Sequence, residues 1–305
     1  FLTIWLLGKS LLQAVSLILR FRPHVIIGTG GYASAPVLLA AILMRFLGIW
    51  KGLLSLHEAN IIPGRFNRWA SGWVDFTGTS FPETLRFLSK KKAFWTGYPL
   101  RKDLESSSER RGEGSEEKRE RLGVPPTGKI LLVFGGSSGA RTINRAVFEA
   151  LPRLLTHQDL HIFHATGHPQ GAYDPVVEFG EILPGLPVEK KDVGERYHQE
   201  PYLHHIERYY EVADLVVCRA GANTLAELAA LGRPSLLVPL STAGSRGDQL
   251  RNAEVFRAAG ASDVMPEETA SPAALRDRVL GLLDGFRGGE PLYDDCSVVV
   301  IRREP

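Results

Sequence analysis

Short apolar runs alternate with helix-length segments along most of the chain, and this alternation limits the possible folds more than any other feature. HVIIG (24–28) precedes SAPVLLAAILMRFLG (34–48), a predicted helix with Pro36 in its first turn and Gly48 as its stop. KILLVFGG (129–136) precedes the predicted helix RTINRAVFEALPRLL (141–155). Further strand-like runs occur at 53–58, 74–80, 92–99, 161–167, 214–221 and 234–240. Strands separated by helices predict an α/β protein with parallel, doubly wound sheets covered by helices on both faces.

Composition narrows the class of protein. The 305 residues are enough for two domains, and 44% hydrophobic with 23% charged residues is typical of a globular chain. A net charge of +2 is close to balanced, so the charge alone gives no reason to expect a nucleic-acid partner. Two cysteines, Cys218 and Cys296, make a disulfide framework a poor interpretation, which suits a reducing compartment.

One charged stretch interrupts the alternation. Residues 103–121 read DLESSSERRGEGSEEKRER, lack apolar periodicity and predict a solvated loop or partly disordered linker. We therefore expect a first domain over 1–100, a charged linker or loop over 101–122 and a second domain over 123–285. The tail 286–305 matches no helical pattern and receives no assignment.

The first 22 residues are strongly apolar but carry Lys9, Gln13, Ser16 and Arg20 on one helical stripe. They have no basic leader, and Lys9 and Gln13 interrupt any membrane-spanning run. Two interpretations follow: a mostly buried helix of an α/β layer, or a helix that partly faces a membrane surface. For the second, the apolar residues would be Phe1, Ile4, Trp5 and Leu12, with a basic rim of Arg20, Arg22, Arg45 and Lys51.

Three glycine-rich corners join predicted strands to helices: GTGGYASAP (28–36), FGGSSGART (134–142) and CRAGANTLAE (218–227). In a parallel sheet such corners lie at the carboxyl edge, where ligands bind. Glycine permits positive φ and close approach of a ligand, and each helix start adds unpaired N–H groups and about half a positive charge. A diphosphate fits this environment, although each corner taken alone is also explained as a tight turn.

The fingerprints of other nucleotide sites are missing. Neither G-x-x-x-x-G-K-[ST] nor G-x-G-x-x-G occurs, and no Asp-x-Asp pair is present to hold a metal ion. A nucleotide-sugar enzyme with these corners would stabilise its leaving diphosphate without a metal. Glu227, one turn into the last helix, would accept hydrogen bonds from ribose hydroxyls, or it would only favour the helix start through the dipole.

Six segments occur in the order found in the MurG family: GTGGYASAP, HEANIIPGRFNR, TGYPLR, FGGSSGAR, ADLVVCRAGANTLAELAALGRPSLLVPL and GDQLRNA. The resemblance runs from about residue 23 to about residue 264. It implies the GT-B architecture, two doubly wound domains facing a cleft. It also implies transfer of N-acetylglucosamine from its UDP conjugate to a lipid-linked muramyl-pentapeptide in peptidoglycan synthesis, without a cofactor.

The resemblance also implies site residues. Ser137 and Arg101 match groups at the donor diphosphate, and Leu203 matches a backbone contact to uracil. Other donor positions are Ala222, Asn223, Thr224, the ribose-binding Glu227, and the sugar-binding Asp248 and Gln249. The implied cleft and acceptor positions are Gly30, Gly31, Tyr32, His57, Glu58 and Asn60.

The chain departs from the family pattern at several positions. Ser138 and Asp248 replace glutamines, and His204 and His205 replace an acidic pair, which we interpret as a solvated helix start rather than a metal site. The family's first glycine loop, with the histidine often proposed as the catalytic base, would precede Phe1. We therefore expect a fragment and assign no catalytic residue.

Three functions remain open at this point. The first is an inverting transferase acting at the cytoplasmic face of the bacterial plasma membrane, as a peripheral protein. The second is a fragment that only binds a UDP-sugar. The third is a UDP-sugar epimerase, against which the GTGGYASAP loop argues because an epimerase needs no lipid acceptor.

Overall fold

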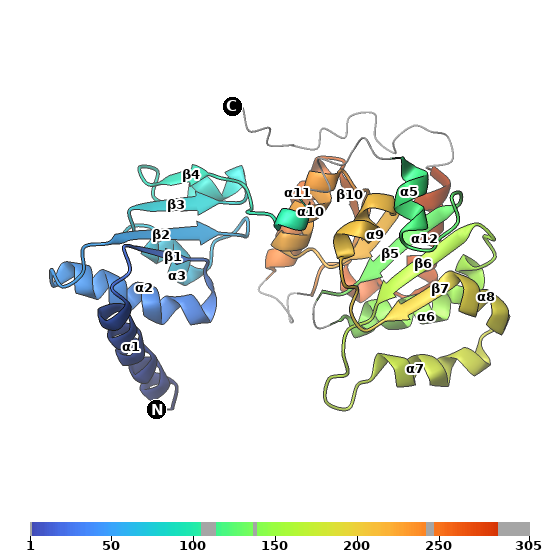
Figure 1. Ribbon diagram of the computed structural model, residues 1–305, viewed down its shortest axis with the longest axis horizontal. Helices are drawn as coiled ribbons and strands as arrows, with labels where there is room; N and C mark the ends of the chain where they lie inside the picture. The colour runs from blue at the N-terminus through green and yellow to red at the C-terminus, as the bar shows by residue number, and fades with distance from the viewer. Residues whose placement is uncertain (1, 105–113, 137–138, 242–246, 286–305) are drawn as a thin grey trace. The chain divides into compact units, whose positions relative to one another are not determined.

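The computed structural model describes residues 2–104, 114–136, 139–241 and 247–285 (Figure 1). The chain divides into two compact units, residues 1–99 and 100–305. Each unit is built on a parallel sheet, so the predicted fold class, two parallel-sheet α/β units, is confirmed.

The first unit contains a four-stranded sheet in the order β1-β2-β3-β4. Its elements are α1 (Leu2–Phe21), β1 (Val25–Gly28), α2 (Gly31–Phe46), β2 (Leu53–Glu58), α3 (Arg65–Ala70), β3 (Phe76–Thr79), the 3-10 helix η1 (Pro82–Phe87) and β4 (Ala93–Trp95). Among these described strands the chain always moves to the next neighbour in the same direction, without the reversal of a doubly wound sheet. The helix α2 begins five residues before Pro36, so Pro36 lies inside it rather than in its first turn.

The core of this unit lies on the side of the sheet along which α2 runs in Figure 1, and α1 packs against α2. Ile26, Leu54 and Leu56 point into it and are buried. Because strand residues alternate between faces, their neighbours Val25 and Ile27 point to the opposite face, where both are exposed. At β1 the buried apolar side chain therefore points to one face of the sheet.

The helix α1 is not the mostly buried helix that one interpretation predicted. Ala14 and Ile18, one turn apart, are its buried hydrophobic residues. Trp5, Leu12 and Phe21 are 61%, 72% and 78% exposed. The reason is that α1 packs mainly on α2, through Ala14 and Ile18 with Leu11 and Val15 beside them. In the described part of the chain, no helix is both long and apolar enough to cross a bilayer.

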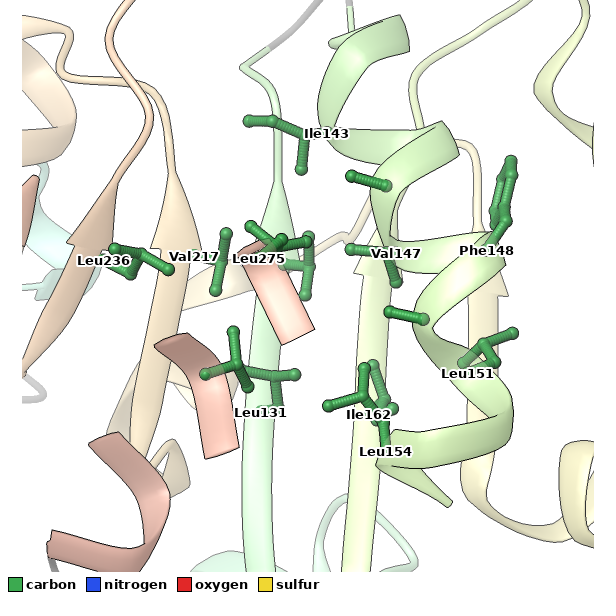
Figure 2. Packing of buried hydrophobic residues seen from close by; sticks show 14 of the residues in the cluster. Leu131, Ile143, Val147, Phe148, Leu151, Leu154, Ile162, Val217, Leu236 and Leu275 are labelled. Carbon is green, nitrogen blue, oxygen red and sulfur yellow. The ribbon is translucent and has the colours of Figure 1, made fainter. Parts of the chain in front are cut away.

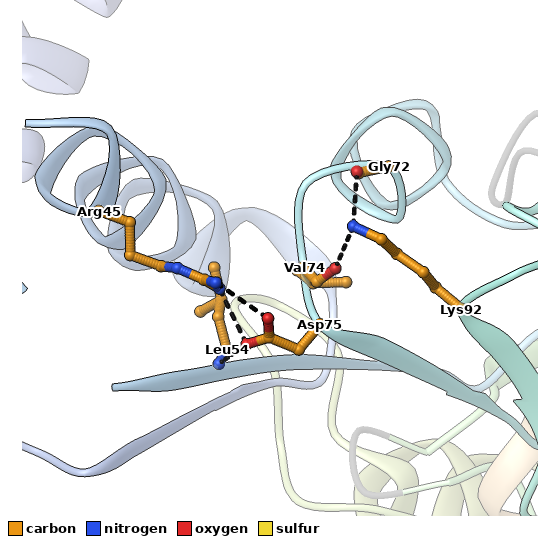
Figure 3. A network of polar contacts seen from close by, with 6 residues as sticks. All are labelled: Arg45, Leu54, Gly72, Val74, Asp75 and Lys92. Atoms are coloured by element: carbon orange, nitrogen blue, oxygen red, sulfur yellow. Dashed lines mark hydrogen bonds and ion pairs between the residues drawn. The ribbon is translucent and has the colours of Figure 1, made fainter. Parts of the chain in front are cut away.

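Figure 3 shows a polar network that fastens α2 to the sheet. Arg45 donates to both carboxylate oxygens of Asp75, at 2.8 and 2.9 Å, and Asp75 also accepts from the backbone N–H of Leu54. The bonded Arg45 guanidinium holds the pKa of Asp75 below its ordinary value. Lys92 donates to the carbonyls of Gly72 and Val74. The charge of Arg45 is thus paired with that of Asp75 within the unit.

The second unit contains a six-stranded parallel sheet in the order β10-β9-β8-β5-β6-β7. Its strands are β5 (Lys129–Phe134), β6 (Leu160–Ala165), β7 (Tyr197–Glu200), β8 (Leu215–Cys218), β9 (Ser235–Leu237) and β10 (Ser262–Val264). Its helices are α5 (Ser115–Glu120), α6 (Arg141–Leu154), α7 (Pro175–Ile182), η3 (Leu183–Gly185), α8 (Lys190–Arg196), α9 (Ile206–Val212), α10 (Ala222–Leu231), α11 (Asp248–Ala258), η4 (Glu267–Thr269) and α12 (Pro272–Gly285). This sheet is doubly wound, because the chain runs outward from β5 to β7 and then outward from β8 to β10 on the other side.

The core of the second unit lies between the sheet and the helices α6 and α12 (Figure 2). Ile162 of β6 lies close to Leu154 of α6, whereas Val217 of β8 lies close to Leu275 of α12. Burying side chains of this size stabilises a fold by about 1.5–3 kcal/mol each. This cluster fixes the strands whose ends carry the glycine corners.

A polar network is buried beside this core. Tyr197 Oη lies 2.9 Å from His164 Nδ1, and Asn144 Oδ1 lies 3.1 Å from His164 Nε2. Asn144 Nδ2 donates to the carbonyl of Thr166 and to Tyr173 Oη, so Asn144 Oδ1 must accept from His164 Nε2–H. This assigns the neutral tautomer, with Nδ1 accepting from Tyr197. Complete burial lowers the pKa of His164 to about 3.

The charged stretch 103–121 is not wholly a solvated loop. Residues Ser115–Glu120 form α5, and Arg119 is buried. Arg119 donates to the carbonyl of Gly128 at 3.0 Å and lies 3.6 Å from the carboxylate of Asp214. The Arg119 side chain anchors α5 by donating to backbone carbonyls. A contact of this kind cannot be predicted from the spacing of apolar residues. Residues 105–113 and 286–305 lie outside the described part of the chain.

Candidate functional site

The centre of the second unit is the point where its sheet reverses direction, between β5 and β8. The two strands are paired, with Phe134 opposite Cys218 at their carboxyl ends. From there the chain enters α6 on one side and α10 on the other. In doubly wound sheets this crevice binds ligands, because the two connections diverge to opposite faces.

Both corners at this reversal are built to leave backbone N–H groups open. The helices α6 and α10 follow Ala140 and Gly221, and neither start has a side-chain cap. Their first N–H groups therefore have no intrahelical partner, and each start carries about half a positive charge. Gly139 has φ +73°, and a Cβ there would lie 2.3 Å from the carbonyl oxygen of Thr166. Ser137 and Ser138 lie outside the described residues.

Glu227 presents a buried carboxylate beside the second corner. It lies on α10 and is only 3% exposed. Tyr210 Oη donates to Oε2 at 3.0 Å, whereas Asn223 Nδ2 donates to Oε1 at 3.1 Å. Arg101 Nη2 also reaches Oε1, at 3.2 Å, and Arg101 is the exposed member of this ion pair. The carboxylate is thus held by three donors at the edge where a ligand would lie.

A second ion pair ties the loops of this edge together. Arg219, which follows β8, pairs with Glu267 and donates to the carbonyl of Val238 at 3.0 Å. Glu267 also accepts from Thr142 Oγ1 at 3.0 Å and from Ser241 N–H at 3.1 Å. Burial raises the pKa of Glu267, but these donors outweigh it and leave the pKa below its ordinary value. The pair links the start of α6 to the loop after β9.

The segment before α9 lies after the carboxyl end of β7. Leu203 is buried there, whereas His204 and His205 are exposed. His205 adopts φ +58° as the residue before α9, and its Nδ1 lies 3.0 Å from Glu207 Oε1. This is the predicted solvated helix start. In the described residues, no three His, Cys, Asp or Glu side chains are grouped as a metal site.

The start of α11 lies after β9, at the same sheet edge. Asp248 and Gln249 are its first two residues, and both are partly buried. Gln249 Oε1 accepts from Leu240 N–H at 2.9 Å, which leaves the amide nitrogen of Gln249 as a donor. Asn252 Nδ2 reaches the carbonyl of Ala220 at 3.4 Å. The α11 start is therefore linked to the loops after β8 and β9.

In the first unit, the predicted cleft residues surround one buried carboxylate. Glu58 accepts from the backbone N–H groups of Asn60 and Gly64 and, at 2.7 Å, from Asn67 Nδ2. Gly30 has φ +84°, and a Cβ there would lie 2.5 Å from Asn67 Nδ2. Glu58 therefore braces the loop 59–64 and the corner at Gly30.

The other predicted cleft residues lie near this brace. His57 Nε2 lies 3.0 Å from the carbonyl oxygen of Gly97. Gly31 and Tyr32 begin α2, directly after Gly30. These positions bring the α2 start and the end of β2 together within one unit.

Comparison with known proteins identifies the group to which the chain belongs. Residues 130–285 match the glycosyltransferase family 28 C-terminal domain, and residues 1–78 match the N-terminal domain of the same family. A relative from Syntrophotalea carbinolica, named UDP-N-acetylglucosamine–N-acetylmuramyl-(pentapeptide) pyrophosphoryl-undecaprenol N-acetylglucosamine transferase, is 37% identical over 277 residues, which is 90% of this chain and 68% of the relative. The chain belongs to the MurG family.

Two further relatives carry the same name. One from Desulforudis audaxviator is 39% identical over 76% of this chain and 58% of its own length. One from Anaeromyxobacter is 36% identical over 99% of this chain and 76% of its own length. The chain thus spans between 58% and 76% of the length of these three MurG relatives.

Solved structures agree with this assignment. The crystal structure of Acinetobacter baumannii MurG superimposes with a TM-score of 0.65 at 25% identity, covering 91% of this chain and 70% of the other. A UDP-GlcNAc 2-epimerase from Neisseria meningitidis, solved bound to UDP-GlcNAc, gives a TM-score of 0.59 at 13% identity over 92% of this chain and 73% of the other. The second likeness shows the fold alone.

The described donor residues expected from the MurG resemblance, which exclude Ser137, lie on loops and helix starts of the second unit. Ala222, Asn223 and Thr224 form the first turn of α10, and Glu227 follows on the next turn. Arg101 contacts Glu227, the last residue of the third glycine corner (218–227).

The structure adds residues that the sequence did not indicate. Tyr210, Arg219, Glu267 and Thr142 were not selected, since their partners come from distant segments. The usable signals were the positions of Arg219 inside the CRAGANTLAE corner and of Thr142 at the end of the FGGSSGART corner.

Proposed function

We propose that the chain binds UDP-N-acetylglucosamine at the β5–β8 reversal of its second unit and transfers the sugar to a lipid-linked muramyl-pentapeptide, in peptidoglycan synthesis. The observation that carries the proposal is the pairing of Phe134 with Cys218, which sets two glycine corners side by side. The carboxylate of Glu227 stands one turn behind one of them. Diphosphate oxygens would accept from the open N–H groups of α6 and α10, and ribose hydroxyls would donate to Glu227.

The reaction would be an inverting displacement. The 4-hydroxyl oxygen of the N-acetylmuramic acid attacks C1 of N-acetylglucosamine and forms the new glycosidic bond, while the bond from C1 to the diphosphate oxygen breaks. Negative charge grows on the departing UDP, and preorganised donors aimed at such charge contribute about 3 kcal/mol each. The hydroxyl proton passes to a base that we do not assign.

Arg101 has a defined place in this proposal. It is the exposed partner of Glu227 Oε1, at 3.2 Å. A ribose hydroxyl that takes this acceptor position releases the guanidinium, which then becomes available to the diphosphate. The ion pair in the free protein and the phosphate contact implied by the family are therefore successive states of one side chain.

Calorimetry and a transfer assay on the 305-residue chain test the proposal together. We expect UDP-N-acetylglucosamine to bind in the micromolar to millimolar range that is usual for enzyme substrates. Transfer is followed with radiolabelled donor and the undecaprenyl-diphosphate-linked muramyl-pentapeptide, and extraction of labelled lipid product is the expected result. UDP-glucose serves as the matched control donor, since it lacks the acetamido group.

The outcomes separate the remaining functions. Binding without product would leave a UDP-sugar-binding module. Conversion of UDP-N-acetylglucosamine to an epimer without any lipid acceptor would favour the epimerase. Absence of any UDP affinity would overturn the proposed site itself.

We further propose that the first unit docks on the cytoplasmic membrane surface through the exposed face of α1. Trp5 and Leu12 are exposed there, and Lys9 lies over the ring of Trp5. Arg20, Arg22 and Lys51 supply exposed positive charge, and the Trp50 side chain bonds to Pro23, which keeps Lys51 close to the end of α1. Apolar side chains beside basic ones are typical of helices that bind anionic lipid surfaces.

Flotation with vesicles containing phosphatidylglycerol tests the membrane proposal. The double variant Trp5→Ser/Leu12→Ser is expected to lower the vesicle-bound fraction by about 10-fold or more, since each side chain contributes on the order of 1.5–3 kcal/mol when buried. The matched control is Val176→Ser/Val177→Ser, which removes two similarly exposed apolar side chains of α7. Equal retention of both variants would contradict the proposal.

A further inference from the structure

The two oxygens of the Glu227 carboxylate differ in their surroundings. Oε2 accepts from Tyr210, which is fully buried, whereas Oε1 accepts from the exposed residues Asn223 and Arg101. A ligand hydroxyl can replace one of the donors to Oε1, because the partners of Oε1 lie at the surface and the partner of Oε2 does not. Oε2 is held from within the protein.

Tyr210 is well suited to hold that oxygen. It lies on α9, and its ring packs edge to face against Phe134, the last residue of β5, with ring centroids 6.0 Å apart. Burial, and then the neighbouring Glu227 charge, raise the pKa of Tyr210 well above its ordinary value, so the phenol remains a donor. A buried hydroxyl bonded to a carboxylate restricts rotation of that carboxylate, because turning it would leave the hydroxyl unpaired.

We infer that Tyr210 is a positioning residue for nucleotide recognition: its hydroxyl fixes the inner oxygen of Glu227, so that a ribose hydroxyl exchanges with Arg101 at the outer oxygen. The inference rests on the proposed function, because it assumes that Glu227 meets the ribose. It adds a residue that touches no ligand yet sets the discrimination between nucleotides with and without ribose hydroxyls. The carboxylate direction, and not only its charge, then determines recognition.

The test compares UDP with 2′,3′-dideoxy-UDP by calorimetry on the 305-residue chain. Tyr210→Phe is expected to weaken UDP binding by about 10-fold, as expected for loss of a hydrogen bond that orients a charged group. The affinity for the dideoxy nucleotide should change by less than about twofold, because it has no hydroxyl for Glu227 to accept. The Kd for 2′,3′-dideoxy-UDP divided by the Kd for UDP is therefore expected to fall in the Tyr210→Phe variant. Tyr209→Phe is the matched control, since that neighbouring ring packs against Phe163 instead and should leave the ratio unchanged.

Each other outcome overturns something definite. If Tyr210→Phe weakens both nucleotides equally and lowers the melting temperature, Tyr210 is only structural and the inference fails. If Tyr210→Phe keeps the wild-type ratio while Glu227→Gln loses it, the inference fails and the proposed function stands. If the wild-type chain binds no UDP, both the inference and the proposed function fail. If Glu227→Gln keeps the ratio, the inference fails together with the ribose contact of Glu227.

Discussion

Replacing Glu227 with glutamine is expected to weaken UDP-N-acetylglucosamine binding by about 100-fold, or about 2.7 kcal/mol. The side chain keeps its size, so packing of α10 is preserved. The amide, however, has one acceptor oxygen in place of two and carries no charge. Because Tyr210 and Arg101 occupy different oxygens of Glu227, the amide group cannot satisfy both donors. Whichever way the amide turns, the ribose meets a weaker or misdirected acceptor.

Calorimetry with UDP-N-acetylglucosamine measures this effect directly. Glu254→Gln is the control, because Glu254 pairs with Arg257 on the exposed side of α11 and should leave affinity within about twofold of wild type. Thermal unfolding of both variants separates a lost contact from a lost fold. Wild-type affinity in the Glu227 variant would remove this carboxylate from the donor site.

The second large effect concerns stability in acid. His164 has a pKa of about 3 in the folded protein, below the value of about 6.5 in an unfolded chain. Between these pH values the unfolded state binds a proton that the folded state does not. The contribution of neutral His164 to the unfolding free energy is therefore fully present above about pH 6.5 and is lost as the pH falls toward 3. From pH 7.5 to pH 4.5 this one group is expected to cost about 3 kcal/mol of unfolding free energy. The glutamine of His164→Gln does not titrate, so this variant should lose about 3 kcal/mol less unfolding free energy than the wild type over the same pH range.

Urea unfolding at the two pH values checks the expectation. The quantity compared is the change in unfolding free energy between pH values, because the substitution itself alters packing at both. His168→Gln is the control, since His168 is exposed after β6 and should keep the wild-type slope. Two partly buried imidazoles, His161 and His198, are present in every variant, so their contributions cancel. An unchanged slope in the His164 variant would show that the imidazole already titrates normally.

Much of the fold followed from local patterns. The strand-like runs at β1, β2, β5, β6 and β8 were predicted because buried parallel strands are short, apolar and followed by helices. The strands β7, which reads YHQE, and β10, which reads SDV, were missed, since edge strands of three or four polar residues carry no such pattern. The sequence left the exposure of α1 open between two interpretations, because hydrophobicity predicts burial only where a partner surface exists.

In the candidate site too, some features follow from local sequence and others depend on the tertiary structure. The sequence determined the glycine corners and the turn-later position of Glu227, because backbone φ and helical spacing are local properties. Only the tertiary structure decided what holds Glu227: Arg101 comes from 126 residues away and Tyr210 from another helix. It also revealed that Glu58 is occupied by loop N–H groups and that Arg45 is neutralised by Asp75. Hydrogen bonds and ion pairs depend on distances of about 3 Å between groups far apart in the chain, and no periodicity in the sequence encodes them.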